Sequence, residues 1–259
     1  MPVTLAFEEF GAADAPPLII LHGFFASSRN WRNVAQQLSD NFHVYVLDMR
    51  NHGASPHNPI MDYAAMADDV LHFMGARQMV AAAILGHSMG GKIAMWLALN
   101  HPGRVTQLLV VDIAPVSYPH SFAKLIGALA ALPLADISNR KQAEMRLAET
   151  IPDLSYRQFL LQNLVLANGS YGWRIDLAIF AHTAPNIAGF PGTRHLAPFA
   201  GSCLFIAGAD SDYVRETDIK PLFPRAIFTR LENAGHWPHV QQPSAFLAEV
   251  RSFLHLPPK

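Results

Sequence analysis

The sequence predicts an α/β protein with a mostly parallel, doubly wound sheet and an inserted helical cap. Strand-like apolar runs alternate with stretches of helical spacing over residues 18–100, a pattern typical of such a sheet. The alternation resumes in the last fifth of the chain. Over residues 121–184, by contrast, the chain reads as consecutive helices without strands. We therefore expect a core made of residues 1–115 and 186–259, and a cap, or lid, made of residues 116–185.

Composition limits the class of protein. The chain has 259 residues, of which 51% are hydrophobic and 15% are charged, as in a compact soluble protein. The formal net charge is −1 and the basic residues are scattered, so we expect no nucleic-acid partner and no stable membrane insertion. The single cysteine, Cys203, lies in an apolar run and is expected in the core. The first residues lack a basic segment followed by an apolar one, so we expect a cytoplasmic protein.

Apolar runs without alternation predict central strands that are buried on both faces. The expected strands are residues 3–10, at an edge, then 18–21, 42–48, 79–85, 105–111, 202–208 and 226–231. The expected core helices are residues 30–38, a stretch capped by Asp62 that runs through Met74, and residues 92–100 and 243–254. Because ligands bind outside the carboxyl ends of the strands in such a sheet, we expect the site at the loops after residues 21, 85 and 111.

The predicted cap is rich in large apolar side chains, with breaks near Pro133, Pro152 and residues 168–169. Its notable apolar residues are Phe122, Leu125, Ile126, Phe159, Leu164, Trp173 and Phe180. Most of them are expected to form the core of the cap. Their number also predicts an apolar roof over the site.

The central motif is Gly-His-Ser-Met-Gly-Gly at residues 86–91. The pattern G-x-S-x-G is weak by itself, but here it follows a predicted strand and opens a predicted helix, as in a nucleophile elbow. Ser88 is therefore the candidate nucleophile. The amide of Met89, at a helix N-terminus, is a candidate donor to an oxyanion. The second donor is expected to be the amide of Phe24, whose ring would also line the pocket.

A serine hydroxyl needs an adjacent base, and the base needs a partner that orients it. His236 is the candidate base, because it lies in a turn after the last strand and comes last in chain order. His22 is expected to shape its own turn. Four other histidines read as loop or surface residues: His52, His57, His101 and His239.

The sequence offers three candidates for the acid. Asp112 ends the strand at residues 105–111, whereas Asp210 and Asp212 follow the strand at residues 202–208. Neighbouring parallel strands lie about 4.8 Å apart, so an acid on either strand could reach a histidine above Ser88. Spacing alone does not choose between them.

Six segments together resemble the α/β-hydrolase superfamily, and more narrowly its branch of YbfF-type esterases and abhydrolase-domain proteins. They are residues 22–24, 48–55, 86–91, 111–115, 159–164 and 234–237. The resemblance spans nearly the whole chain. It implies an α/β-hydrolase fold and a serine esterase acting on small carboxylic esters, in which Ser88 and His236 match the nucleophile and the base.

The resemblance also bears on the acid. In the wider superfamily the acid stands three residues after the glycine that ends the penultimate strand, and that position here is Ser211. In the narrower branch the residue that matches Asp112 is taken as the acid. We therefore favour Asp112, with Asp210 as the alternative and Asp212 third.

Together these features predict a carboxylesterase that hydrolyses small, short-acyl esters by a Ser-His-Asp acyl-enzyme mechanism. Its expected partner is a small-molecule ester, and the mechanism requires neither a metal nor an organic cofactor. Thioester, lactone or carbon–carbon bond hydrolysis on the same frame is the alternative within enzymes. A ligand-binding receptor that retains a hydrolase fold is the alternative from another class, because fold alone does not fix function.

Overall fold

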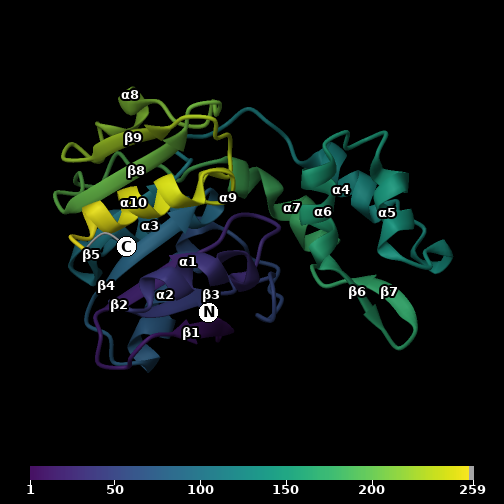
Figure 1. Ribbon diagram of the computed structural model, residues 1–259, viewed down its shortest axis with the longest axis horizontal. Helices are drawn as coiled ribbons and strands as arrows, with labels where there is room; N and C mark the ends of the chain where they lie inside the picture. Colours follow the sequence, from purple (N-terminus) through teal and green to yellow (C-terminus); the bar gives the residue numbers. More distant parts are fainter. Residues whose placement is uncertain (257–259) are drawn as a thin grey trace.

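The computed structural model describes residues 1–256, and its centre is a seven-stranded sheet with strand order β1-β3-β2-β4-β5-β8-β9 (Figure 1). The strands are β1 (Phe7–Phe10), β2 (Pro17–Leu21), β3 (His43–Leu47), β4 (Ala82–His87), β5 (Val105–Val111), β8 (Ser202–Gly208) and β9 (Ile227–Leu231). β1 runs antiparallel to β3, and the other neighbouring strands of this sheet are parallel. The predicted doubly wound sheet is confirmed.

Helices cover both faces of the sheet. They are η1 (Ser28–Trp31), α1 (Arg32–Leu38), α2 (Tyr63–Ala76), α3 (Met89–Asn100), η2 (Pro102–Arg104), α8 (Glu216–Ile219), α9 (Pro238–Gln241) and α10 (Pro243–Phe253). One hydrophobic cluster joins α2 and α3 to the sheet, and a second joins α1 and α10 to it. Alternate residues of β2 divide between the clusters: Ile19 and Leu21 lie in the first, Leu18 and Ile20 in the second. The strands are therefore buried on both sides, as their apolar runs predict.

Two element ends differ from the prediction at the central motif. β4 continues through His87, and α3 begins at Met89 rather than at residue 92. The glycines of this motif are expected at a tight turn from strand to helix. In the structure they let the strand and the helix meet at a single residue, Ser88. The predicted N-cap of helix α2 at Asp62 is confirmed, since its side chain accepts a hydrogen bond from the amide of Ala65 at 2.8 Å.

Between β5 and β8 the chain leaves the sheet and forms a separate lobe beside the carboxyl ends of the strands (Figure 1). The lobe contains α4 (Ala123–Ala130), η3 (Leu134–Asp136), α5 (Arg140–Leu147), α6 (Leu154–Leu160), η4 (Leu161–Asn163), β6 (Leu164–Ala167), β7 (Ser170–Trp173) and α7 (Leu177–Ala188). α7 runs past residue 185, where we placed the end of the cap. The division of the chain into core and cap stays a prediction.

The expectation of helices without strands in this segment is wrong, because β6 and β7 form an antiparallel hairpin. Asn168 and Gly169 connect the two strands and both have positive φ, 52° and 78°. A two-residue turn of this kind needs left-handed backbone at both positions, which asparagine and glycine adopt most readily. From the sequence we expect only a break between helices at residues 168–169, where the structure has the turn of this hairpin.

The sequence predicts a buried cysteine and no stable membrane insertion. Cys203 is buried in β8, as predicted, and burial raises the pKa of its thiol to about 11. Within residues 1–256, none of the helices combines the length and the hydropathy needed to cross a bilayer.

The expectation that His52 and His239 are loop or surface residues is wrong with respect to exposure, because both side chains are buried. His52 is held at Nδ1 by the carbonyl of Arg50 at 2.9 Å. His239 stacks on Trp31 with ring centroids 4.1 Å apart. The hydrogen bond compensates for the burial of His52, and the local sequence reveals neither this contact nor the stacking of His239. His57 and His101 are exposed, as predicted.

Four buried histidines are expected to make the fold sensitive to acid. Desolvation lowers the pKa of His22, His52, His87 and His239, in the case of His87 to about 3. The folded state keeps them neutral, whereas the unfolded chain protonates them below pH 6.5, so stability is lost as the pH falls through that value. A histidine whose pKa in the folded state lies below 5 lowers the free energy of unfolding by about 2 kcal/mol between pH 6.5 and pH 5.

Urea unfolding at pH 7 and pH 5 measures this loss. His239→Phe retains an aromatic ring but cannot be protonated, so we expect it to lose less stability than the parent protein over that interval. His101→Gln, at an exposed position, is the control and should lose as much as the parent. An equal loss in His239→Phe would contradict the assignment.

Candidate active site

Ser88 lies at a sharp junction between β4 and α3. Its backbone has φ 51° and ψ −117°, a conformation that costs free energy for a residue with a side chain. A Cβ at Gly86 would overlap the carbonyl of Gly90, and a Cβ at Gly90 would overlap the carbonyl of Leu21. The two glycines therefore let strand, helix and the end of β2 approach closely.

Ser88, His236 and Asp112 form a continuous chain of hydrogen bonds. His236 Nε2 lies 3.1 Å from Ser88 Oγ, and His236 Nδ1 lies 2.7 Å from Asp112 Oδ2. Three segments supply these side chains: the β4–α3 junction, the loop after β9 and the end of β5. The structure therefore brings together the predicted nucleophile, base and favoured acid.

Asp112 is completely buried and its carboxylate accepts further hydrogen bonds. Oδ1 accepts from the amide of Gly208 at 2.9 Å, and Oδ2 accepts from Ser211 Oγ at 2.6 Å. Ser211 occupies the position where the wider superfamily usually carries the acid, and here it donates to the candidate acid Asp112, directly after the neighbouring strand β5. The side chains of Asp210 and Asp212 are exposed, and the structure does not join them to His236.

The predicted oxyanion donors face the same cavity as Ser88. Met89 is the first residue of α3, so its amide has no acceptor within the helix. Phe24 follows β2, and two buried histidines hold the turn around it. His22 donates from Nδ1 to the carbonyl of Gly23 and accepts from the amide of Met49 at Nε2, which confirms its predicted role in shaping the turn. His52 Nε2 accepts from the amide of Phe25 at 3.3 Å.

His87 is a supporting residue that sequence reasoning missed. It is the variable position before the serine in the motif, and its Nε2 lies 2.7 Å from the backbone carbonyl of His236. Burial lowers the pKa of His87 to about 3, so the ring is neutral and can donate to that carbonyl. The residue next to the candidate nucleophile thus holds the backbone of His236.

A cavity of about 700 Å³ opens above Ser88 and is mostly walled by aromatic rings. On one side the Phe24 ring stacks on Phe180, with centroids 4.6 Å apart, and meets Phe122 edge-on at 5.0 Å. Tyr213, another residue that the sequence did not single out, stacks on His236 at 4.3 Å. On the other side lie three further rings, Tyr156, Phe159 and Trp237.

The predicted apolar roof is thus formed by part of the residues named for it. Phe122 and Phe159 line the cavity, and Phe180 backs Phe24. The others pack with the hydrophobic cluster that runs through the lobe: Leu125, Ile126, Leu164 and Trp173.

Lys92 joins the helix after Ser88 to the lobe, a role that its place directly after the motif did not reveal. Its Nζ donates to the carbonyls of Ala188 and Gly189, at 3.0 and 2.6 Å, where α7 ends. It also lies 4.6 Å from the centre of the Tyr118 ring. Burial lowers the pKa of Lys92 to about 7. This side chain lines the cavity but stays bonded to the end of α7.

Comparisons with known proteins agree with this architecture. A model described as the alpha/beta hydrolase family matches residues 18–250. The sn-1-specific diacylglycerol lipase ABHD11 of Danio rerio is 38% identical, over 98% of this chain and 83% of that protein. Esterase YbfF of Escherichia coli (strain K12) is 35% identical, over 92% of this chain and 93% of that protein.

A solved structure described as a marine microorganism esterase superposes with a TM-score of 0.92. It is 37% identical, and the match covers 97% of this chain and 99% of that one. The family model and these relatives span nearly all of the sheet and the lobe together. The chain therefore belongs to the α/β-hydrolase family and is a hydrolase of the esterase and lipase type.

Proposed function

We propose that this protein is a serine carboxylesterase in which Ser88 is the nucleophile, His236 the base and Asp112 the acid. The observation that carries the proposal is the unbroken hydrogen-bond chain from Ser88 Oγ through His236 to the buried carboxylate of Asp112. A neutral His236 that donates from Nδ1 to Asp112 leaves the lone pair of Nε2 facing the serine hydroxyl. That is the tautomer a general base needs.

In the acylation step, Ser88 Oγ forms a bond to the ester carbonyl carbon as its proton passes to His236 Nε2. The negative charge on the former carbonyl oxygen is stabilised by the amides of Phe24 and Met89, and one such donor contributes about 3 to 4 kcal/mol. Collapse of the tetrahedral intermediate breaks the bond to the alcohol oxygen. His236 gives its proton to that leaving oxygen, and an acyl group remains on Ser88.

Water then completes the cycle by the same route in reverse. His236 takes a proton from the water as its oxygen attacks the acyl carbon, and the second tetrahedral intermediate uses the same two amides. Breakdown returns the proton to Ser88 Oγ and releases the carboxylic acid. Each step uses protein groups and water alone.

The proposed substrates are small carboxylic esters with a short acyl group. Relatives whose printed names are esterase and diacylglycerol lipase favour ester hydrolysis over the thioester, lactone and carbon–carbon alternatives. The aromatic walls of the cavity suit apolar groups on either side of the ester. An intact set of Ser88, His236 and Asp112 disfavours a receptor without turnover.

Hydrolysis of p-nitrophenyl esters, from acetyl to long acyl chains, tests the proposed class of reaction. We expect turnover to be fastest for short acyl chains. Ser88→Ala should lower kcat by roughly 10⁶-fold, because no other group can take over the attack. Circular dichroism of the variant controls for folding. Equal rates in the two proteins would refute the serine mechanism.

A matched pair of substitutions tests the acid. Asp112→Asn removes the charge that orients His236 and leaves the shape of the side chain, so we expect kcat/KM to fall by about 10⁴-fold. Asp210→Asn, at an exposed position in the loop after the neighbouring strand β8, should stay within about twofold of the parent because surface substitutions have small effects. Similar losses in both variants would refute the assignment of Asp112.

A further inference from the structure

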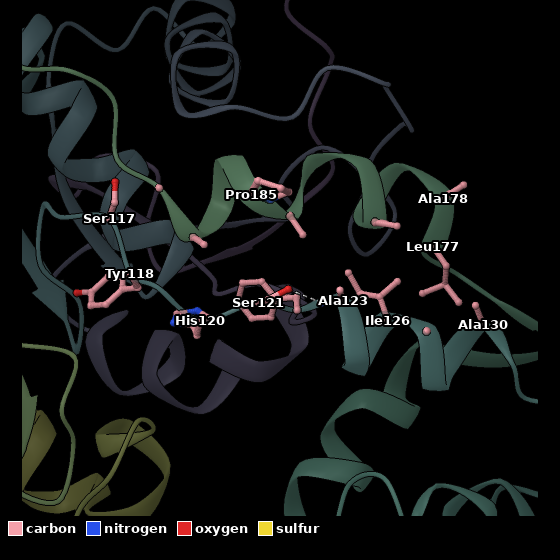
Figure 2. Close-up of a pocket in the computed structure, with 16 residues that line it drawn as sticks. Ser117, Tyr118, His120, Ser121, Ala123, Ile126, Ala130, Leu177, Ala178 and Pro185 are labelled. Atoms are coloured by element: carbon pink, nitrogen blue, oxygen red, sulfur yellow. Dashed lines mark hydrogen bonds between the residues drawn. The ribbon is translucent and has the colours of Figure 1, made fainter.

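A second cavity, of about 710 Å³, lies between α4 and α7 in the lobe (Figure 2). At one end it is lined by polar and aromatic residues, Ser117, Tyr118 and His120. Figure 2 shows these residues at the opposite end from Leu177 and Ala130, with α7 running along one side of the space and α4 along the other. The cavity is thus an elongated groove with a polar end and an apolar end.

Small residues on the facing sides of the two helices create this groove. α4 contributes residues at helical spacing that include Ala123, Gly127 and Ala130, and α7 contributes Ala178 and Ala181. These side chains are too short to fill the space between the two helices, which leaves the cavity of about 710 Å³ open. The lining given by the described residues includes no aspartate, glutamate, lysine or arginine. An uncharged, unbranched apolar group fits this chemistry.

The groove borders the cavity above Ser88. Tyr118, His120 and Phe122 line both. The Tyr213 ring, which stacks on His236, also lies 5.2 Å from the Tyr118 ring and 5.7 Å from the His120 ring. The polar end of the groove therefore begins one aromatic ring away from the candidate base.

We propose that the groove binds the unbranched alkyl chain of the alcohol half of an ester substrate. This inference rests on the proposed function, in which the acyl group is short and His236 gives its proton to the leaving alkoxide. The alcohol half must then lie on the side of His236, from which Tyr213 and Tyr118 lead to the groove. α7 lines it from Leu177 to Ala188, a distance of about 16 Å along the helix axis.

Burial of an alkyl chain in this groove predicts a dependence of rate on chain length. Each methylene moved from water to an apolar site contributes enough free energy for about a fourfold increase in kcat/KM. The increase should continue until the apolar end of the groove is reached. An alcohol of one or two carbons would not enter the groove and reports on the catalytic cavity alone.

The experiment compares two series of esters by titration of the released acid. In the first, the acyl group is kept as acetyl and the alcohol is lengthened from ethyl to octyl. In the second, the alcohol is kept as ethyl and the acid is lengthened over the same range. We expect kcat/KM of the parent protein to rise along the first series and not along the second.

Ala181→Phe fills the groove from α7 without touching the candidate catalytic residues. It should lower kcat/KM for octyl acetate by about 10-fold or more and leave ethyl acetate within about twofold. His182→Phe is the matched control, because it adds the same ring at the next, exposed position of α7, which does not line the groove. It should leave both rates unchanged.

Gly127→Leu gives an independent test from the opposite wall, should Ala181→Phe fail to fold. A Cβ at Gly127 meets no atom within 4 Å, so a side chain there extends into open space. It should reproduce the selective loss on octyl acetate. With ethyl acetate still hydrolysed, the proposal would be overturned if kcat/KM of the parent protein did not change along the alcohol series. It would also be overturned if the groove substitutions lowered kcat/KM for long acyl chains instead of long alcohols. No hydrolysis of any ester would refute the proposed function itself.

Discussion

The buried carboxylate of Asp112 is the group on which the arrangement of the site depends. A charge without exposure to water is costly unless hydrogen-bond donors surround it. Here the donors come from the end of β8, from the loop after β8 and from the loop after β9. Those segments are distant in sequence, and they converge only because β5 and β8 pair in register, with the amide of Asp112 donating to the carbonyl of Ile206. The same strand pairing thus stabilises the sheet and orients His236.

The lobe is attached to the core by polar contacts at two places. At the end of α7, Tyr63 donates from its hydroxyl to the carbonyl of Ile187, next to the two carbonyls that Lys92 reaches. These are the carbonyls that a helix C-terminus leaves without partners of its own. At the end of η4, Asn163 Nδ2 donates to the carbonyl of Phe25, beside the candidate oxyanion donor. The lobe is therefore tied to helices α2 and α3 and to the loop after β2 that carries Phe24 and Phe25.

Most of the core could be predicted from sequence because its strands are buried on both faces and read as unbroken apolar runs. Ser88 and His236 could be placed because the motif and the chain order identify them. The choice between Asp112 and Asp210 could not be made from spacing. It depends on side-chain direction, and Asp112 has a positive φ of 49° that no local pattern announces.

Other features escaped prediction because they depend on partners far away in the chain. The burial of His239 follows from its stacking on Trp31, and that of His52 from its contacts with the turn around Phe25. The hairpin in the lobe has short, half-exposed strands, so its hydrophobic pattern is weak and only the Asn-Gly pair marks it. The supporting roles of His87, Lys92 and Ser211 likewise appear only when distant segments are brought together.

The strained backbone of Ser88 has a consequence for the energy of the reaction. β4 is hydrogen-bonded to β2 on one side and to β5 on the other, and the amide of Ser88 itself donates to the carbonyl of Val111. The strand pairing holds the serine in its unfavourable conformation before any substrate arrives. In the proposed mechanism, the candidate nucleophile Ser88 and the amide of Met89 therefore need little rearrangement as charge develops. Free energy released on folding is stored as preorganisation, and the reorganisation energy of the chemical step is correspondingly small.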